Sequence, residues 1–511
     1  MLRAVIGAVK RVLRIAARIT IRNSYQLRQL STKTKRVITA VFNSSVSVPT
    51  WVLLFLILAA GYAVVMSVLF PSVRWFFRRR LNRAVDKLNS KLHIAIRPLQ
   101  STKRQVLIDQ LIFDQDILSL IESQAVEENI PREVLQQRVR SYAREIVPSF
   151  NAYVYYQVFY WLAKKVSRFI YRVRVAAARP KDLQRVNPDS TVVFVMNHRS
   201  NMDYILISYL AAERVTLSYA VGEWAKVFPL ETLIRAMGAF FVRRGSQNPL
   251  YRKVLERYVY MATQNGVCQA VFLEGGLSRN GLLGEPKIGF LDYILRNYDA
   301  KRDREVVFVP IGINYDHVLE DQNLLNWDKK DNRLSTAAHL KKLWSFLKLN
   351  LFAGSRARWG RYGYASVNFG VPVSMRDYCK QHSLDFKNLE KEQRIPKVVE
   401  LANYLMNELR FVMPIIPVPI LCVVFLNAKN KPLTSLEVFS DCDALIDSMI
   451  AKGAAMKPDE KPRHRTLSNS LEMLHQRGLL IEKDDQFILN EPNRGLVEYY
   501  ANSIEHWWRA S

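Results

Sequence analysis

The segment TVVFVMNHRSN at residues 191–201 continues directly into MDYILISYLAA, and together they predict a strand, a turn and a helix. The β-branched and apolar residues at 192–195 are typical of a buried strand, and the polar cluster at 197–201 is typical of the turn that ends it. From Met202 onward, apolar residues recur at helical spacing. His198 is therefore expected at the carboxyl end of a strand, where an open α/β sheet usually carries its chemistry.

The spacing of His198 and Asp203 indicates a catalytic pair. In one straight helix, two residues five apart would point about 140° away from each other, but a strand–turn–helix lets the carboxylate fold back onto the imidazole. Because histidine exchanges a proton near neutral pH, we predict that His198 is a general base and that Asp203 orients it. A structural alternative stays open, because Ser200 and Asp203 also form an S-x-x-D capping pattern and His198 would then be an ordinary loop residue.

Length and charge narrow the class of protein. The chain has 511 residues, 49% hydrophobic and 23% charged, which is the composition of a globular protein with a membrane element. The net charge of +28 favours anionic partners such as phospholipid headgroups, phosphorylated substrates, acidic carrier proteins or nucleic acid. No nucleic-acid-binding motif occurs, so we expect no nucleic acid partner. The four cysteines form no C-x-x-C pair, and no metal site is predicted.

The N-terminal region carries no acidic residue before Asp86. Residues 2–18 place apolar side chains on one helical face and most lysines and arginines elsewhere, which predicts a basic amphipathic helix in an anionic membrane interface. A transit peptide and a nucleic-acid-binding arm are the alternatives.

Residues 51–70, WVLLFLILAAGYAVVMSVLF, predict a membrane helix, since this uncharged segment would be about 30 Å long. Arginines concentrate close to its C-terminal side, at residues 74–83, which favours a cytoplasmic location for the rest of the chain. We therefore expect a protein of the cell inner membrane with its catalytic domain on the cytoplasmic side. A re-entrant or half-inserted segment is the alternative.

In the middle of the remaining chain, short apolar strands alternate with helical patterns, which predicts an α/β fold with a mixed, largely parallel sheet. The regions before and after it have helical patterns, so we expect helical N- and C-terminal regions on either side of the sheet. The proline-interrupted stretch at 411–426 is interpreted as a membrane-contacting or buried loop. The strand candidates are residues 192–195, 239–242, 270–273, 306–311 and 366–369. The predicted organisation is 1–80 membrane-anchoring segment, 81–184 helical region, 185–376 α/β catalytic domain and 377–511 helical region.

Three further segments combine a strand with unusual polar residues. MGAFFVRR at 237–244 ends a strand in two arginines, a pair suited to bidentate phosphate binding. FLEGGLSRNGLLGEPKIG at 272–289 places glycines, a hydroxyl and cations after a strand, where backbone N–H groups can approach an anion. VFVPIGINYD at 307–316 predicts a pocket wall. The candidate substrate-binding residues are Arg199, Arg243, Arg244, Glu274, Gly275, Gly276, Ser278, Arg279, Lys287 and Pro310.

The ordered blocks N-H-R-S-x-x-D, G-A-F-F-V-R-R, F-L-E-G-G-x-S-R-x-G and V-P-I resemble the four blocks of the glycerolipid acyltransferase superfamily. Within it, the chain is most similar to the bacterial membrane-bound glycerol-3-phosphate acyltransferases and the related dihydroxyacetone-phosphate acyltransferases. The resemblance implies that His198 deprotonates an acceptor hydroxyl, which attacks the thioester of acyl-CoA or acyl carrier protein, while Asp203 orients His198. It also implies that Arg243 and Arg279, with residues 274–278, hold the phosphorylated acceptor. No metal or cofactor is expected, because a thioester is already activated.

One position departs from the pattern. Members of the glycerol-3-phosphate type usually carry an arginine where this chain has Leu277. Losing a guanidinium from a phosphate site removes a charge-assisted hydrogen bond, so the acceptor is the open point of the resemblance. The alternatives to glycerol 3-phosphate are dihydroxyacetone phosphate, a lysophospholipid, or no reaction at all in a membrane-tethered lipid-binding scaffold.

Overall fold

The computed structural model describes Leu99 and residues 102–509, apart from 153, 178–179, 212–216, 223–229, 244, 326–361 and 455–462. These residues belong to one compact unit, Arg83–Ser511, and the other unit, Met1–Asn82, lies outside the described residues. The amphipathic and membrane-spanning segments predicted within 1–80 therefore stay predictions. Within the described part of the chain, no helix is both long enough and apolar enough to cross a bilayer.

The central sheet has eight strands in the order β1-β7-β6-β2-β5-β3-β4, with β8 paired to β6. Its neighbours run parallel except where β6 pairs with β7 and β8, which confirms the predicted mixed, largely parallel sheet. The strands are β1 (Arg172–Ala177), β2 (Thr191–Met196), β3 (Leu217–Gly222), β4 (Phe240–Val242), β5 (Cys268–Phe272), β6 (Val306–Tyr315), β7 (Tyr364–Phe369) and β8 (Val373–Ser374).

Strand β2 lies in the interior of this sheet between β5 and β6 and is parallel to both. Met196, its last residue, is in register with Phe272 at the end of β5. Since the carboxyl ends of parallel strands meet at one edge, the turns that follow β2 and β5 lie next to each other. This register brings His198 and Glu274 together, although they are far apart in sequence.

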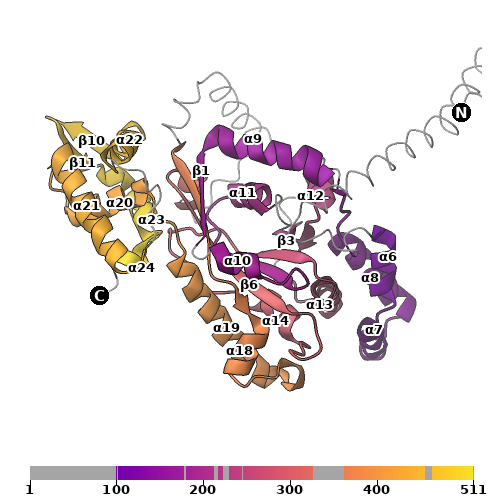
Figure 1. The fold of residues 1–511 in the computed structure, drawn as a ribbon. Helices are drawn as coiled ribbons and strands as arrows, with labels where there is room; N and C mark the ends of the chain where they lie inside the picture. Colours follow the sequence, from indigo (N-terminus) through magenta and orange to yellow (C-terminus); the bar gives the residue numbers. More distant parts are fainter. Residues whose placement is uncertain are drawn as a thin grey trace, which may run out of the picture. The chain divides into compact units, whose positions relative to one another are not determined.

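Side-chain alternation along β2 feeds two hydrophobic cores, one on each face of the sheet. Phe194 belongs to the core that includes α9, α11 and α20, whereas Val193 and Val195 belong to the core that includes α13, α14 and α19. Figure 1 shows α9 and α11 on one side of the sheet and α14, α18 and α19 on the other. The helices named so far are α9 (Tyr160–Ile170), α11 (Met202–Ala211), α13 (Pro249–Gln264), α14 (Gly289–Leu295), α18 (Met375–Gln381), α19 (Lys391–Phe411) and α20 (Pro417–Asn427).

The first three helices of the described part of the chain pack over α13. They are α6 (Arg104–Ile112), α7 (Gln115–Glu127) and α8 (Arg132–Ile146), and all three contact α13. A π-helix at Val154–Phe159 leads into α9, and two short helices, α10 (Pro180–Arg185) and α12 (Leu230–Ala236), connect strands. The edge strand β1 lies inside the region predicted to be helical and corrects that prediction locally.

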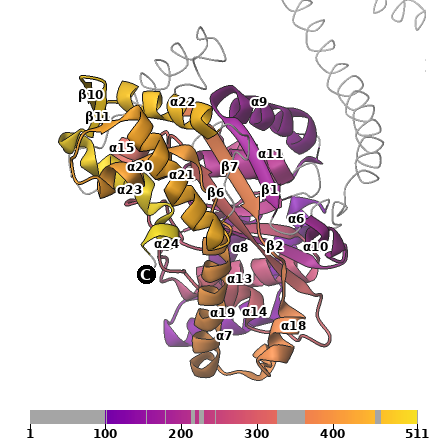
Figure 2. The same ribbon diagram turned by 60° about the vertical axis from the view of Figure 1, so that its left-hand side comes forward.

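The C-terminal region is built around α20, which is buried along residues 417–425. The interpretation of residues 411–426 as a loop is wrong, because Pro417 occupies the first turn of α20, where its missing N–H leaves no hydrogen bond unmade. The burial half of that interpretation holds. Figure 2 shows the neighbouring helices gathered around α20. They are α21 (Ser435–Ala451), α22 (Arg463–Gln476) and α23 (Arg494–Asn502), followed by α24 (Glu505–Trp508).

A small antiparallel sheet, which the sequence did not predict, joins these C-terminal helices. Its strands are β9 (Leu433–Thr434), β10 (Leu480–Lys483) and β11 (Gln486–Leu489). The helix α23 contacts the loop that follows β5, where the Asn502 side chain donates to the Asn280 carbonyl at 2.9 Å. The Tyr499 carbonyl oxygen of this helix lies so close to Gly281 that a Cβ there would be 1.8 Å away.

Candidate active site

The turn that follows β2 is anchored to the sheet through Asn197. Its side-chain amide donates to the Ile313 carbonyl oxygen, and its side-chain oxygen accepts from the Ile313 N–H, each at 2.8 Å. The Asn197 side chain thus makes the hydrogen bonds to β6 that a strand backbone would otherwise make. The backbone can therefore leave the sheet at Asn197 while the polar groups of Ile313 stay hydrogen-bonded. Asn197 and the next three residues are all buried.

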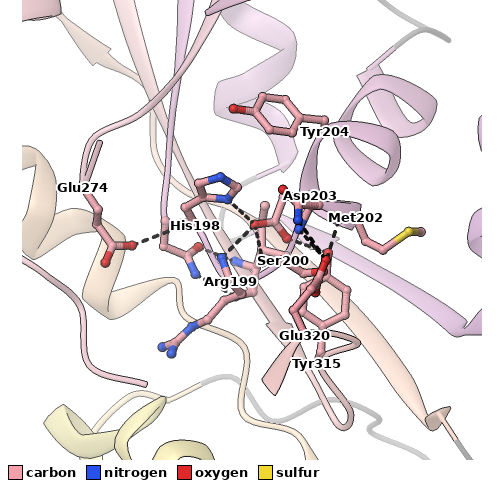
Figure 3. A network of polar contacts seen from close by, with 12 residues as sticks. His198, Arg199, Ser200, Met202, Asp203, Tyr204, Glu274, Tyr315 and Glu320 are labelled. Carbon is pink, nitrogen blue, oxygen red and sulfur yellow. Dashed lines mark hydrogen bonds and ion pairs between the residues drawn. The ribbon is translucent and has the colours of Figure 1, made fainter. Parts of the chain in front are cut away.

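The turn places the His198 ring against the Asp203 carboxylate (Figure 3). The distance between His198 Nδ1 and Asp203 Oδ2 is 2.9 Å, and the two residues are 2% and 0% exposed. The same carboxylate oxygen accepts hydrogen bonds from the backbone N–H groups of Arg199 at 2.7 Å and Ser200 at 3.0 Å. The contact with the Ser200 N–H is the one that the S-x-x-D pattern predicts, and it is present together with the contact to the imidazole.

A buried tyrosine completes the surroundings of Asp203. The Tyr315 hydroxyl, at the end of β6, donates to Asp203 Oδ1 at 2.6 Å. Burial first, and then the neighbouring Asp203 charge, raise the pKa of Tyr315 well above its usual value, so the hydroxyl stays a donor. Pro310 was the residue predicted to be functional in the segment at 307–316, and Tyr315 was missed.

Glu320 supports the other half of the turn and was also missed. The Ser200 hydroxyl donates to Glu320 Oε2 at 2.7 Å, and the Asn201 side chain donates to Glu320 Oε1 at 3.1 Å. Burial raises the pKa of Glu320, while these hydrogen bonds act in the opposite direction. The carboxylate therefore fixes the residues that connect His198 to α11.

Glu274 and Ser278 hold the turn from the side of β5. Glu274 Oε1 accepts from the His198 N–H at 2.9 Å, and Oε2 accepts from the Gly284 N–H at 2.8 Å. The Ser278 N–H donates to the His198 carbonyl at 2.9 Å, and its hydroxyl donates to the Leu282 carbonyl at 2.7 Å. Burial raises the pKa of Glu274. Both residues were predicted to bind the acceptor, and the structure uses their polar groups to position His198.

A cavity of about 480 Å³ opens beside His198. The imidazole stacks on Phe272 with ring centroids 3.9 Å apart, and both rings line the cavity. Since Nδ1 is taken by Asp203, Nε2 is the ring nitrogen available to a substrate. Three cationic side chains of the described residues line the same cavity: Arg243, Arg252 and Lys287. Its apolar lining includes Ala220, Val221, Phe240, Val242, Leu255, Val271 and Phe290.

Of the predicted binding residues that the structure describes, three line this cavity: Gly275, Arg243 and Lys287. Gly275 does so with a φ of +70°, and a Cβ on it would lie 2.9 Å from Lys287 Cγ, so a glycine is needed for this close approach. Arg243 also lines it, but its guanidinium is paired with Glu145, with Nε–Oε1 and Nη2–Oε2 distances of 2.9 and 2.5 Å. This bidentate pair raises the pKa of Arg243.

The other predicted binding residues lie elsewhere. Among the described residues, the cavity lining does not include Arg199, Arg279 or Pro310. Arg199 is 1% exposed and donates from Nη1 to the Gly281 carbonyl, whereas Arg279 is exposed. Pro310 lies within β6, where its carbonyl accepts from the Gly370 N–H. Gly276 is half-buried in the turn after β5, and Arg244 is outside the described residues.

Comparison with protein families gives this site a context. Residues 178–314, which contain the turn and most of the cavity, match the Acyltransferase family. Residues 348–508 match the family described as Glycerol-3-phosphate acyltransferase C-terminal region. The chain carries an acyltransferase domain. The resemblance to the glycerolipid acyltransferases is thereby confirmed, and His198, Asp203 and Glu274 all belong to the acyltransferase domain.

Curated relatives agree with these families. The chain is 28% identical to the glycerol-3-phosphate acyltransferase of Aeromonas hydrophila, over 84% of this chain and 53% of that protein. It is 25% identical to the one of Xanthomonas axonopodis pv. citri, over 85% and 49%. The chain thus spans about half the length of the curated relatives it matches. Among solved structures, a 1-acyl-sn-glycerophosphate (LPA) acyltransferase from Thermotoga maritima is 18% identical and covers 60% of this chain and 97% of that one, with a TM-score of 0.28.

Proposed function

We propose that this chain transfers a fatty acyl group from acyl-CoA or acyl carrier protein to glycerol 3-phosphate, giving 1-acylglycerol 3-phosphate for phospholipid synthesis. The observation that carries the proposal is the buried His198–Asp203 pair, which opens onto a cavity with both apolar and cationic lining. Apolar walls suit an acyl chain, and cations suit a phosphate. The relatives named glycerol-3-phosphate acyltransferase favour this acceptor over the others.

The reaction begins when the acceptor hydroxyl donates a hydrogen bond to His198 Nε2. As the proton moves to the imidazole, the Asp203 carboxylate stabilises the resulting imidazolium, and the acceptor oxygen forms a bond to the thioester carbonyl carbon. The tetrahedral intermediate then collapses with cleavage of the carbon–sulfur bond. The leaving thiolate takes the proton back from the imidazolium, which restores the neutral histidine. Proton transfer by a positioned group contributes about 10²- to 10⁴-fold to such a reaction.

The surroundings of the pair serve this cycle by holding the ring in one orientation. The Glu274 carboxylate fixes the His198 backbone, Phe272 fixes the plane of the ring, and Asp203 fixes the identity of the nitrogen that faces the cavity. Preorganisation of this kind removes the need to reorient the base at each turnover. No cofactor takes part in the proposed reaction, because the thioester supplies the activated acyl group.

We further propose that the enzyme works at the inner membrane, with the acyltransferase domain on the cytoplasmic side. Supporting this are the uncharged residues 51–70, the arginines at 74–83 and the amphiphilic product that the reaction would release. A membrane would receive that product directly, and an anionic leaflet would attract the basic N-terminal region.

The test is acyl transfer from labelled palmitoyl-CoA and palmitoyl carrier protein by membranes that contain the full chain. Glycerol 3-phosphate, dihydroxyacetone phosphate and lysophosphatidate are offered in parallel, with His198→Ala as the control. The expected result is a product from glycerol 3-phosphate that His198→Ala abolishes. Transfer only to another acceptor would overturn the assigned substrate. Undiminished activity of His198→Ala would overturn the mechanism, and no transfer to any acceptor would favour a silent scaffold.

A further inference from the structure

The three cations that line the cavity differ in how far their charge is already neutralised. Arg243 is held by the bidentate contact with Glu145. Within the described part of the chain, neither Arg252 nor Lys287 pairs with a carboxylate. Among the described residues that line the cavity, Arg252 and Lys287 therefore supply the positive charge available to a ligand.

Arg252 is held in place without being neutralised. It lies in the first turn of α13, where its Nε donates to the Ser246 carbonyl at 2.7 Å and its Nη2 donates to the Gln247 side-chain oxygen at 2.8 Å. Among the described residues, Nη1 has no hydrogen-bond partner. Both partners are neutral acceptors, so they orient the guanidinium and leave its charge for an anion. An oriented planar group loses little conformational freedom on binding.

Lys287 is directed by the turn that follows β5. Its backbone N–H donates to the Leu273 carbonyl at 2.7 Å, and its side-chain stem lies against the Cα of Gly275. The missing Cβ of Gly275 makes room for this stem. Gly275 of the E-G-G sequence thus makes room for a lysine that lines the same cavity as His198.

Residues 272–281, which include Leu277, place no cationic side chain in the cavity lining. Leu277 is partly buried and packs against the hydrophobic core that contains α20 and α23. Arg279 is exposed and, of the described residues, is not one that lines the cavity. A phosphate bound beside His198 would therefore meet cations from α13 and from residue 287.

We propose that Arg252 and Lys287 form the phosphate subsite for the acceptor, and that Arg252 supplies the guanidinium missing at Leu277. The inference rests on the proposed function, because it names the part of the same cavity that selects a phosphorylated acceptor. Two cations match the charge of a phosphate monoester, and the fork of a guanidinium suits two of its oxygens. The acyl chain would then occupy the apolar part of the lining.

The test compares Arg252→Gln and Lys287→Gln with Arg302→Gln and Lys301→Gln in the full chain. The last two are matched controls, since Lys301 and Arg302 are exposed and line no cavity described for the chain. Each cavity variant is expected to lower kcat/KM for glycerol 3-phosphate about 10- to 100-fold, mainly through KM. The kcat/KM for unphosphorylated glycerol should change little, so the ratio of kcat/KM for glycerol 3-phosphate to that for glycerol should fall by the same factor. Arg252→Lys, which keeps the charge and loses the fork, should recover part of the loss.

Calorimetric titration with glycerol 3-phosphate separates this inference from the proposed function. The native chain should bind it, and Arg252→Gln should weaken binding by the same factor as it weakens kcat/KM. If Arg279→Gln has the larger effect, or both cavity variants behave like the controls, the subsite is wrong while the acyltransferase proposal stands. If the chain binds glycerol 3-phosphate through Arg252 but transfers no acyl group, the subsite stands and the proposed function falls. Failure of both binding and transfer overturns both.

Discussion

The turn after β2 and the cationic side of the cavity lie next to each other and use polar groups in opposite ways. In the turn, the Asp203 carboxylate accepts four hydrogen bonds, and residues 197–200 are buried. On the cationic side, Arg252 is exposed, and its hydrogen bonds within the described part of the chain go to neutral acceptors. A general base must be oriented before the substrate arrives, whereas a binding group must keep donors unused until then.

Whether a polar side chain is already hydrogen-bonded within the protein distinguishes positioning residues from binding residues better than its residue type does. Glu274 and Ser278 have side chains that could bind a substrate, yet their hydrogen bonds go to the turns around His198. Lys287 belongs to the same segment and has no such internal use among the described residues. Substitutions in the turn should therefore change kcat, and substitutions on the cationic side should change KM.

The largest effect is expected from Asp203→Asn. The amide keeps the size of the side chain but removes the charge that stabilises the imidazolium. Its N–H₂ group would also face one of the donors that now bind the carboxylate, so that hydrogen bond would be lost. We expect kcat to fall about 10³-fold with little change in KM, because the loss falls on the transition state. Steady-state kinetics with varied glycerol 3-phosphate measure both constants. A rise in KM at constant kcat would instead place Asp203 with the binding residues.

Much of this architecture could be predicted from local sequence. The five predicted strands are present because β2, β4, β5, β6 and β7 are short apolar runs, and the helix after the turn begins at Met202 as predicted. The pairing of His198 with Asp203 could be predicted because both residues lie within one strand–turn–helix unit. The strand β1 was missed, although Val173 and Val175 alternate with arginines, because it follows a long helical region.

The parts that were missed depend on contacts between distant segments. Tyr315 is 112 residues from Asp203, and Glu145 is 98 residues from Arg243. No local pattern shows that a predicted phosphate-binding arginine already has a carboxylate partner in α8. Arg252 was missed for a related reason, since an arginine in the first turn of an amphipathic helix is indistinguishable in sequence from a solvated one.

The loop that contains Gly281 packs closely against Tyr499 of α23. In Gly281→Ala the new Cβ would lie 1.8 Å from the Tyr499 carbonyl oxygen at a φ of +84°, so α23 must move or the loop must refold. We expect the free energy of unfolding to fall by roughly 2–4 kcal/mol, measured by urea denaturation. Gly453→Ala is the matched control, because Gly453 has a φ of +92° with nothing within 4 Å, and should cost about 1 kcal/mol. Equal losses in the two variants would show that the contact with Tyr499 does not matter.

The smallest of these effects is expected from Tyr315→Phe, which removes one of the four hydrogen bonds to Asp203. Without that donor the carboxylate keeps more of its charge for the imidazolium, so the acidic limb of the pH dependence of kcat/KM should move to higher pH. We expect kcat to fall about tenfold at neutral pH, because the carboxylate also loses a fixed orientation. Tyr499→Phe is the control, since the buried Tyr499 hydroxyl has no hydrogen-bond partner among the described residues. If both variants lose activity but neither shifts the pH profile, Tyr315 contributes packing alone, and the network around the base ends at Asp203.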